Sequence, residues 1–113
     1  MSLWEIEYFP AKGERNSPTD KLGEICDIDE QAEFQQKFRT LRELEAKYWS
    51  FKWLKPVKGF YQVHQGNFRG YFKLYGRKIV VFHFCRKVAN KIKVEDVRIA
   101  ESNRERYEKG LHE

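Results

Sequence analysis

The sequence lacks any apolar run long enough to cross a membrane. Its longest run, Lys78-Ile-Val-Val-Phe-His-Phe-Cys85, is far shorter than the ~20 residues that a membrane-spanning helix needs. The segment from Met1 to Glu7 carries acidic residues where a secretory signal has basic ones, and no long apolar stretch follows it. We therefore expect a cytoplasmic protein that makes no contact with a membrane.

Cysteine is scarce. The two cysteines, Cys26 and Cys85, lack the close spacing of a metal site or a redox pair, and two are too few for a disulfide framework. We expect both to be reduced, buried thiols. The strand-like region at 60–86 contains no cluster of Asp, Glu and His that could hold a magnesium ion, so the sequence predicts neither a metal nor another cofactor.

Acidic residues are absent from Ala46 to Val94. This stretch holds twelve Lys and Arg residues, whereas the rest of the chain holds ten basic residues against seventeen acidic ones. Such a block attracts a polyanion, because each phosphate that Lys or Arg neutralises releases condensed counterions. A nucleic-acid partner is the interpretation that we favour, and a merely solvated basic surface is the alternative.

The chain has 113 residues, 41% of them hydrophobic, which is enough for one domain with a real core but not for two. Alternating residues predict a strand at Leu3–Phe9, which Pro10 ends. In the polar loop at 11–20, Ser17 before a proline is able to cap a short helix. A closing helix is predicted from Val94 to Tyr107, ending near Gly110.

A longer helix is predicted from Asp29, its expected N-cap, to a point before Trp53. The side chains spaced to share its apolar face are Phe34, Phe38, Leu41, Leu44 or Glu45, and Tyr48.

Two glycine turns divide the region at 60–86 into three strand-like runs. Gly66-Asn67 and Gly76-Arg77 both suit two-residue hairpin loops. The sequence therefore predicts a three-stranded meander of Phe60–Gln65, Phe68–Tyr75 and Lys78–Arg86. Together with the N-terminal strand and the helices, this gives an α+β fold, in which a small twisted antiparallel sheet packs on helices in a single domain covering residues 1–113.

The turns also predict which residues pair, and hence which side chains share a face. The pairs expected in the first hairpin are Gln65 with Phe68, His64 with Arg69, and Gln62 with Tyr71. Those expected in the second are Leu74 with Ile79, Phe72 with Val81, Gly70 with His83, and Arg69 with Phe84. The predicted core face carries Tyr61, Val63, Phe68, Phe72, Leu74, Ile79, Val81, His83 and Cys85. The opposite, exposed face carries Gln62, His64, Arg69, Tyr71, Lys73 and Arg86.

The predicted exposed face collects groups that suit RNA cleavage. That reaction needs a base for the ribose 2′-OH and cations that stabilise the phosphorane. Histidine titrates near neutral pH, so His64 suits the base, and the guanidinium fork of Arg69 suits the phosphate. Residues expected to bind RNA or phosphate are Arg86, Lys87, Lys73, Tyr71 and Gln62. His83, which we place in the core, is expected to be structural, and Tyr107 is expected to pack rather than react.

Four segments resemble the phage-derived, HigB-like branch of the RelE/ParE toxins of type II toxin–antitoxin systems. They are Gly59-Phe-Tyr-Gln-Val-His64, Phe68-Arg-Gly-Tyr-Phe72, Ile79-Val-Val-Phe-His-Phe-Cys-Arg-Lys87 and Val94-Glu-Asp-Val-Arg-Ile-Ala100. The likeness spans about residues 55–107, and the predicted order of elements agrees with that family. Two positions depart from it, since Gln62 stands where the family usually has Glu and His64 where it usually has Arg.

The resemblance implies a metal-independent endoribonuclease that cuts messenger RNA on the ribosome. It implies that Arg69 contacts the scissile phosphate, and that Arg86 and Lys87 are the family's basic pair after the third strand of the meander. It also implies a cognate antitoxin, of helix-turn-helix type, that masks the basic face. Two alternatives stay open: a ParE-like gyrase inhibitor, in which His64 and Arg69 would be expected to be lost, and a non-catalytic nucleic-acid-binding or protein-binding module.

Overall fold

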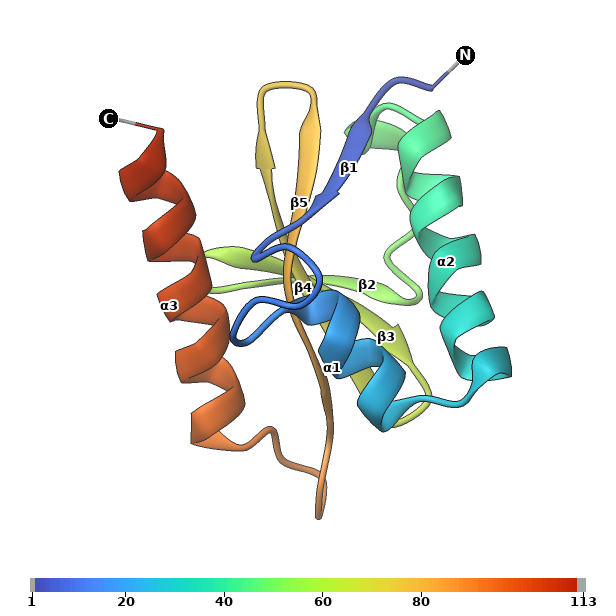
Figure 1. The fold of residues 1–113 in the computed structure, drawn as a ribbon. Helices are drawn as coiled ribbons and strands as arrows, with labels where there is room; N and C mark the ends of the chain where they lie inside the picture. Colours follow the sequence, from blue (N-terminus) through green and yellow to red (C-terminus); the bar gives the residue numbers. More distant parts are fainter. Residues whose placement is uncertain (1, 112–113) are drawn as a thin grey trace.

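The five strands of the protein form one mixed sheet in the order β1-β5-β4-β3-β2 (Figure 1). The computed structural model describes residues 2–111. The strands are β1 (Glu5–Tyr8), β2 (Leu54–Val57), β3 (Phe60–Gln65), β4 (Phe68–Tyr75) and β5 (Lys78–Arg86). The helices are α1 (Pro18–Ile25), α2 (Ile28–Glu43) and α3 (Val94–Gly110), with a short 3-10 helix, η1 (Ala46–Tyr48). The α+β fold predicted from the sequence is confirmed.

Two features of the sheet were not predicted. β1 pairs with the first half of β5 in parallel, so the sheet is not wholly antiparallel. β2 adds a fifth strand, antiparallel to β3, in a segment that the sequence marked only as the end of a helix. Pro56 explains why this strand is hard to recognise, because proline cannot donate to a ladder and is confined mainly to sheet edges. β2 is such an edge strand.

The helices α1 and α2 begin at side-chain caps. The Ser17 side chain accepts a hydrogen bond from the backbone of Asp20, which confirms the expected start of α1. The start of α2 was predicted two residues too late, since its N-cap is Asp27 and not Asp29. The Asp27 carboxylate accepts from the backbone of Glu30, and the Glu30 side chain accepts in return from the backbone of Asp27.

The end of α2 was predicted too far along the chain. The helix stops at Glu43, and the indole of Trp49 folds back to donate to the carbonyls of Leu41 at 3.0 Å and Leu44 at 3.1 Å. This side chain satisfies carbonyl groups that a helix end leaves without partners. Because the helix stops here, Tyr48 is exposed and does not share the apolar face of α2.

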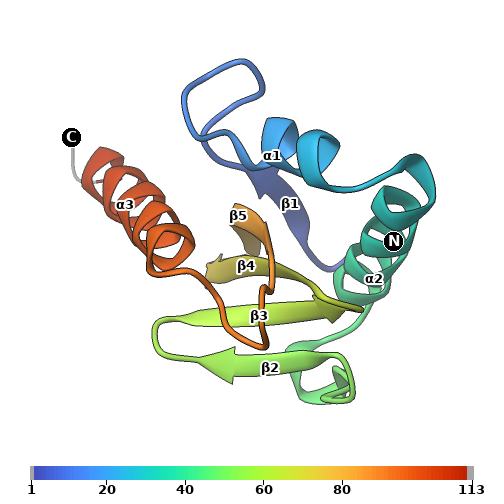
Figure 2. The ribbon, with the colours of Figure 1, turned by 90° about the horizontal axis from the view of Figure 1, so that it is seen from below.

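The helices cover the two faces of the sheet, α1 and α2 on one side and α3 on the other (Figure 2). The core under α1 and α2 comprises Leu22, Cys26, Phe34, Phe38, Leu41, Trp49, Leu54, Val63, Phe68, Phe72, Ile79, Val81 and Phe84. The core under α3 comprises Phe60, Tyr71, Val80, Phe82, Cys85, Ala100 and Tyr107. Tyr107 thus packs in the core, as predicted. Val94 and Val97, at the start of α3, are exposed.

The three strands of the meander have the bounds predicted from the sequence. The register of the first hairpin is also confirmed, with His64 opposite Arg69 and Gln62 opposite Tyr71. In the second hairpin, Leu74 lies opposite Ile79 and Phe72 opposite Val81, as predicted.

Beyond Val81 the predicted register of the second hairpin is wrong. A bulge leaves Phe82 without a partner, so Tyr71 lies opposite His83, Gly70 opposite Phe84, and Arg69 opposite Cys85. An extra residue shifts all later side chains of one strand to the other face. His83 and Cys85 therefore lie on the α3 side, and Phe84 takes the expected place of His83 under α1 and α2.

The bulge is held from α3. The side-chain amide of Asn103 donates to the carbonyl of Phe82 at 2.9 Å and to that of Asn16 at 3.1 Å. It thereby joins α3 to the irregular point of β5 and to the loop before α1. Both cysteines are free and buried, as expected. No helix within residues 2–111 is both long and apolar enough to span a membrane.

Candidate functional site

Two rows of polar side chains cross the α3 side of the sheet. The first row is Gln62 on β3, Tyr71 on β4 and His83 on β5. The second row, one step nearer the Gly66-Asn67 turn, is His64, Arg69 and Cys85. Directly opposed residues of antiparallel strands share a face and lie close together. The bulge at Phe82 brings the residues of β5 into both rows.

His64 is half-buried and forms a hydrogen-bonded chain with the first row. Its Nε2 lies 2.6 Å from Oε1 of Gln62, and Nε2 of Gln62 donates to the hydroxyl of Tyr71 at 2.9 Å. Because the Gln62 oxygen is an acceptor only, this arrangement places the proton of neutral His64 on Nε2. Nδ1 is then the proton-accepting atom of the ring, and it has no hydrogen-bond partner among the described residues and is not buried.

The environment keeps His64 neutral. Partial burial lowers the pKa of its imidazole, and the positive charges of Arg69, Lys55 and Lys87 lower that pKa further. Both effects disfavour the imidazolium form. At neutral pH, His64 is therefore an uncharged base with a free Nδ1.

Arg69 was expected on an exposed sheet face, and this expectation was wrong. Its side chain is only 7% exposed, because the guanidinium turns back over the hairpin. Nη1 donates to the carbonyl of Gly66 at 2.7 Å and to that of Phe68 at 2.8 Å. Nε and Nη2 make no hydrogen bond within residues 2–111 and are not buried. Arg69 is thus held by Nη1 at the hairpin, and its Nε and Nη2 are left without a protein acceptor.

Gln62 and Tyr71, predicted to contact RNA, are buried as well. α3 lies over their end of the sheet, and Ala100 packs in the same cluster as Tyr71. Burial raises the pKa of the Tyr71 phenol to about 12, the nearby Cys85 raises it too, and the hydrogen bond from Gln62 opposes the shift. Tyr71 therefore stays protonated and anchors Gln62, which in turn orients His64.

The remaining predicted cations lie at opposite ends of the sheet. Arg86 is exposed at the end of β5, over the ring of Phe68, and the backbone of Lys87 donates to the carbonyl of Asn67 at 2.7 Å. Both therefore lie at the end of the sheet that holds His64 and Arg69. The predicted face of Arg86 was wrong, because the bulge places it opposite Phe68 and hence on the α1 and α2 side, where it lines a pocket with Glu30 and Glu33. Lys73 does not, because its ammonium is 2.7 Å from the carboxylate of Glu108 near the end of α3.

Charge at the His64 end is unbalanced. Within residues 2–111, no carboxylate lies within ion-pair distance of Arg69, Arg86 or Lys87. The acid-free segment does contain cations that acids from elsewhere neutralise, since Glu7 pairs with Lys78 at 3.3 Å. Lys73 and Lys78 are neutralised at the other end of the sheet, whereas Arg69, Arg86 and Lys87 have no ion-pair partner within the described residues, although Glu30 and Glu33 line a pocket with Arg86.

A second histidine site was missed by sequence reasoning. His83 is 1% exposed, and its Nε2 lies 2.8 Å from Oδ1 of Asp96 in the first turn of α3. Burial lowers the pKa of His83, although the hydrogen bond to Asp96 and the charge of Asp96 act in the opposite direction. His83 is structural, as expected, but it binds α3 and not the core under α2. The only sequence signal would have been the acid in the first turn of the final helix.

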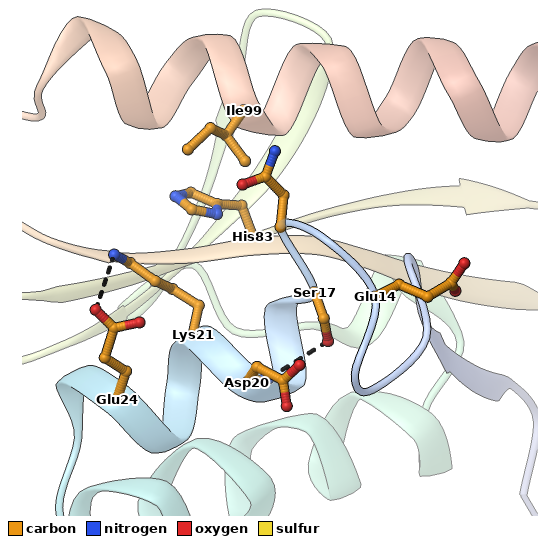
Figure 3. Close-up of a pocket in the computed structure, with 8 residues that line it drawn as sticks. Glu14, Ser17, Asp20, Lys21, Glu24, His83 and Ile99 are labelled. Carbon is orange, nitrogen blue, oxygen red and sulfur yellow. Dashed lines mark hydrogen bonds and ion pairs between the residues drawn. The ribbon is translucent and has the colours of Figure 1, made fainter.

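His83 also lines a pocket of about 180 Å³ between α1 and α3. Figure 3 shows its ring near Ile99 of α3, with Lys21 and Glu24 paired on α1 below it. None of the lining residues belongs to the His64 row. This pocket is therefore separate from the candidate site.

The described part of the chain contains no group of three or more His, Cys, Asp and Glu side chains that could hold a metal ion. Comparison with protein-family models, with curated proteins and with solved structures found no match for this chain. The assignment of the site therefore depends on its own chemistry: a neutral histidine, an arginine with free donors and an unbalanced basic surround.

Proposed function

We propose that this protein is a metal-independent endoribonuclease of the RelE/HigB type that cuts messenger RNA on the ribosome. The observation that carries the proposal is the pair of His64 and Arg69, opposite each other on β3 and β4. One offers an uncharged base nitrogen and the other guanidinium donors without a protein acceptor, and neither group is wholly shielded from solvent. These are the two groups that cleavage by the ribose 2′-OH needs first.

In the proposed reaction, Nδ1 of His64 accepts the proton of the 2′-OH. The 2′-oxygen then attacks the adjacent phosphorus, and the guanidinium of Arg69 stabilises the negative charge that develops on the phosphoryl oxygens. The 5′-oxygen leaves and takes up a proton. The products are a 2′,3′-cyclic phosphate and a 5′-hydroxyl end.

Other residues act around this pair. Gln62, held by Tyr71, keeps His64 in the tautomer that presents Nδ1. Lys87 binds a phosphate next to the cleaved one, supported by its charge acting on His64, and Arg86, at the same end of the sheet but on its other face, binds one farther along the strand. A cytoplasmic site of action, a helix-turn-helix antitoxin as partner and the ribosome as platform follow from the family resemblance and form part of the same proposal.

The direct test uses programmed ribosomes, a labelled message and purified protein, with EDTA doses that leave the ribosomes intact. The expected result is cleavage with cyclic-phosphate and 5′-hydroxyl ends, reduced by about 10²–10⁴-fold in His64→Ala, the range typical for removal of a general base. A message that stays intact with wild-type protein contradicts the proposal. It would favour a non-catalytic binding role or gyrase inhibition.

The pH dependence separates this activity from a contaminating nuclease. The wild-type rate should rise with pH through the folded pKa of His64, which lies below 6.5, and level off near neutrality. Gln62→Glu places a carboxylate beside the ring, so the rise should move to higher pH. A contaminant would give the same profile with both proteins, and a flat wild-type profile would remove His64 from the role of base.

A further inference from the structure

We propose that residues 47–55 form a stacking surface for single-stranded RNA next to the site, an inference that rests on the proposed function. The segment reads Lys47-Tyr-Trp-Ser-Phe-Lys-Trp-Leu-Lys55 and is called here the aromatic-lysine segment. It contains the last two residues of η1, the turn that follows, and the first two residues of β2. The sequence placed this segment in the acid-free block expected to attract a polyanion, but it predicted no stacking role for its aromatic rings.

The aromatic-lysine segment exposes two rings. Tyr48 is 64% exposed and Phe51 is 53% exposed, and within residues 2–111 they are the aromatic members of the group of exposed large hydrophobic side chains. The other aromatic rings of the chain are at least partly buried. Two exposed rings three positions apart therefore form a local feature that the core does not explain.

The backbone that carries these rings is firmly held. Trp49, between them, is only 4% exposed, packs against the rings of Tyr61 and Phe72, and donates its indole proton to α2. Because this backbone is fixed, Tyr48 and Phe51 point outward and lose little conformational entropy when a ligand binds. Rigid aromatic side chains stack on bases at low entropic cost.

The segment is also joined to the catalytic strand. The backbone of His64 donates to the carbonyl of Trp53 at 2.7 Å, and Lys55 lies close enough to lower the pKa of His64. An RNA strand with its phosphate at His64 and Arg69 can therefore reach the aromatic-lysine segment by passing round the edge strand β2, since Trp49 of this segment packs on the α1 and α2 side.

Charge decides which occupant fits. Lys47, Lys52 and Lys55 are exposed around the two rings, and Lys47 lies 5.2 Å from the ring centre of Tyr48. The one acid in ion-pair contact with these lysines within the described chain is the exposed Glu45, 3.5 Å from Lys47. A second copy of this chain would bring like charges together. A strand that alternates bases with phosphates matches both the rings and the lysines.

The experiment measures binding without cleavage. A labelled 2′-O-methyl RNA, which has no 2′-OH to react, is titrated with wild-type protein, with Tyr48→Ser and with the double variant Tyr48→Ser/Phe51→Ser over a series of salt concentrations. The control is Ile28→Ser, which removes an exposed apolar side chain from the start of α2. Thermal unfolding of each variant is followed in parallel.

Removal of each stacking ring should weaken binding by roughly five- to 150-fold, while Ile28→Ser leaves it unchanged. The salt slope should stay that of the wild type, because Tyr and Phe neutralise no phosphate. A strand of abasic sugar-phosphate should bind all four proteins equally. If the folded Tyr48→Ser and double variants bind RNA as tightly as the wild type, the inference is overturned. The two exposed rings would then be assigned to contact with a protein partner.

The two proposals fail in different ways. If the protein binds RNA through Tyr48 and Phe51 but leaves the ribosomal message intact, the stacking surface is supported and the proposed nuclease activity is rejected. If the wild type cleaves the message, and the Tyr48 and Phe51 variants cleave it and bind RNA equally well, the nuclease is supported and the stacking surface is rejected. Wild-type protein that does not bind the 2′-O-methyl strand overturns the stacking surface directly.

Discussion

The two faces of the sheet come from alternating residues of the same strands, yet their chemistry differs. Under α1 and α2, Phe34, Phe38, Phe72 and Phe84 pack edge-to-face in a wholly apolar cluster. Under α3, the buried residues include Gln62, Arg69, Tyr71, His83 and Asp96. Burial stabilises the first face directly, whereas on the second face it must be matched by hydrogen bonds.

The difference shows what α3 contributes. It supplies Asp96 to His83, Asn103 to the bulge, and a cover for Gln62 and Tyr71. The polar rows are therefore ordered and partly shielded from water, which strengthens each hydrogen bond within them. A sheet face open to solvent would carry the same side chains without a fixed tautomer at His64.

The largest effect on stability is expected on the apolar face. Phe34→Ala should lower the free energy of unfolding by about 3–5 kcal/mol, because Phe34 is fully buried against Phe84 and its removal leaves a cavity. His64→Ala should cost much less, since His64 is half-buried and its truncation opens to solvent. Urea unfolding of both variants measures the contrast, and equal decreases would mean that the two faces do not differ energetically.

A smaller, pH-dependent effect is expected at His83. His83→Gln should cost about 1–3 kcal/mol at about pH 7.5, because it perturbs the buried bond to Asp96. In the wild type the folded pKa of His83 is depressed, so its unfolded state binds more protons below the ordinary histidine pKa of 6.5. Wild-type stability should therefore fall as pH drops through this range towards the folded pKa.

A comparison of the wild type with His83→Gln checks the direction of this pH dependence of stability. The gap in unfolding free energy between wild type and His83→Gln should narrow on acidification, because the variant lacks the titrating group. Urea unfolding at a series of pH values provides the measurement. A gap that widens at low pH would mean that the charged form of His83 is the one that the fold stabilises.

The smallest effects are expected from single surface cations. Replacing Arg86 and Lys87 by Gln should flatten the salt dependence of RNA binding, with a change of about 0.7 in the logarithmic slope for each phosphate that is no longer neutralised. Lys73→Gln is the matched control and should leave the slope unchanged, because Glu108 already neutralises Lys73. Equal changes in the two cases would place RNA across the whole sheet and remove the distinction between its ends.

Local patterns were enough to predict much of the candidate site. The turn at Gly66-Asn67 allows two residues in its loop, so the pairing of His64 with Arg69 followed from counting outward from it. The bounds of β3, β4 and β5 followed from the same turns. The burial of Arg69 could not be predicted in this way, because it depends on carbonyl groups that face the guanidinium only once the hairpin has formed.

The sequence by itself determined the meander, its first register, the cap at Ser17 and the closing helix, because each depends on residues close together in the chain. Tertiary structure decided the rest. The bulge at Phe82 is joined to Asn103, twenty-one positions away, and β1 finds its parallel partner more than seventy positions along the chain. These features depend on the packing free energy of a whole sheet face, to which residues far apart in the chain contribute. Within β5, the one unpaired residue at the bulge determines on which face His83 and Cys85 lie.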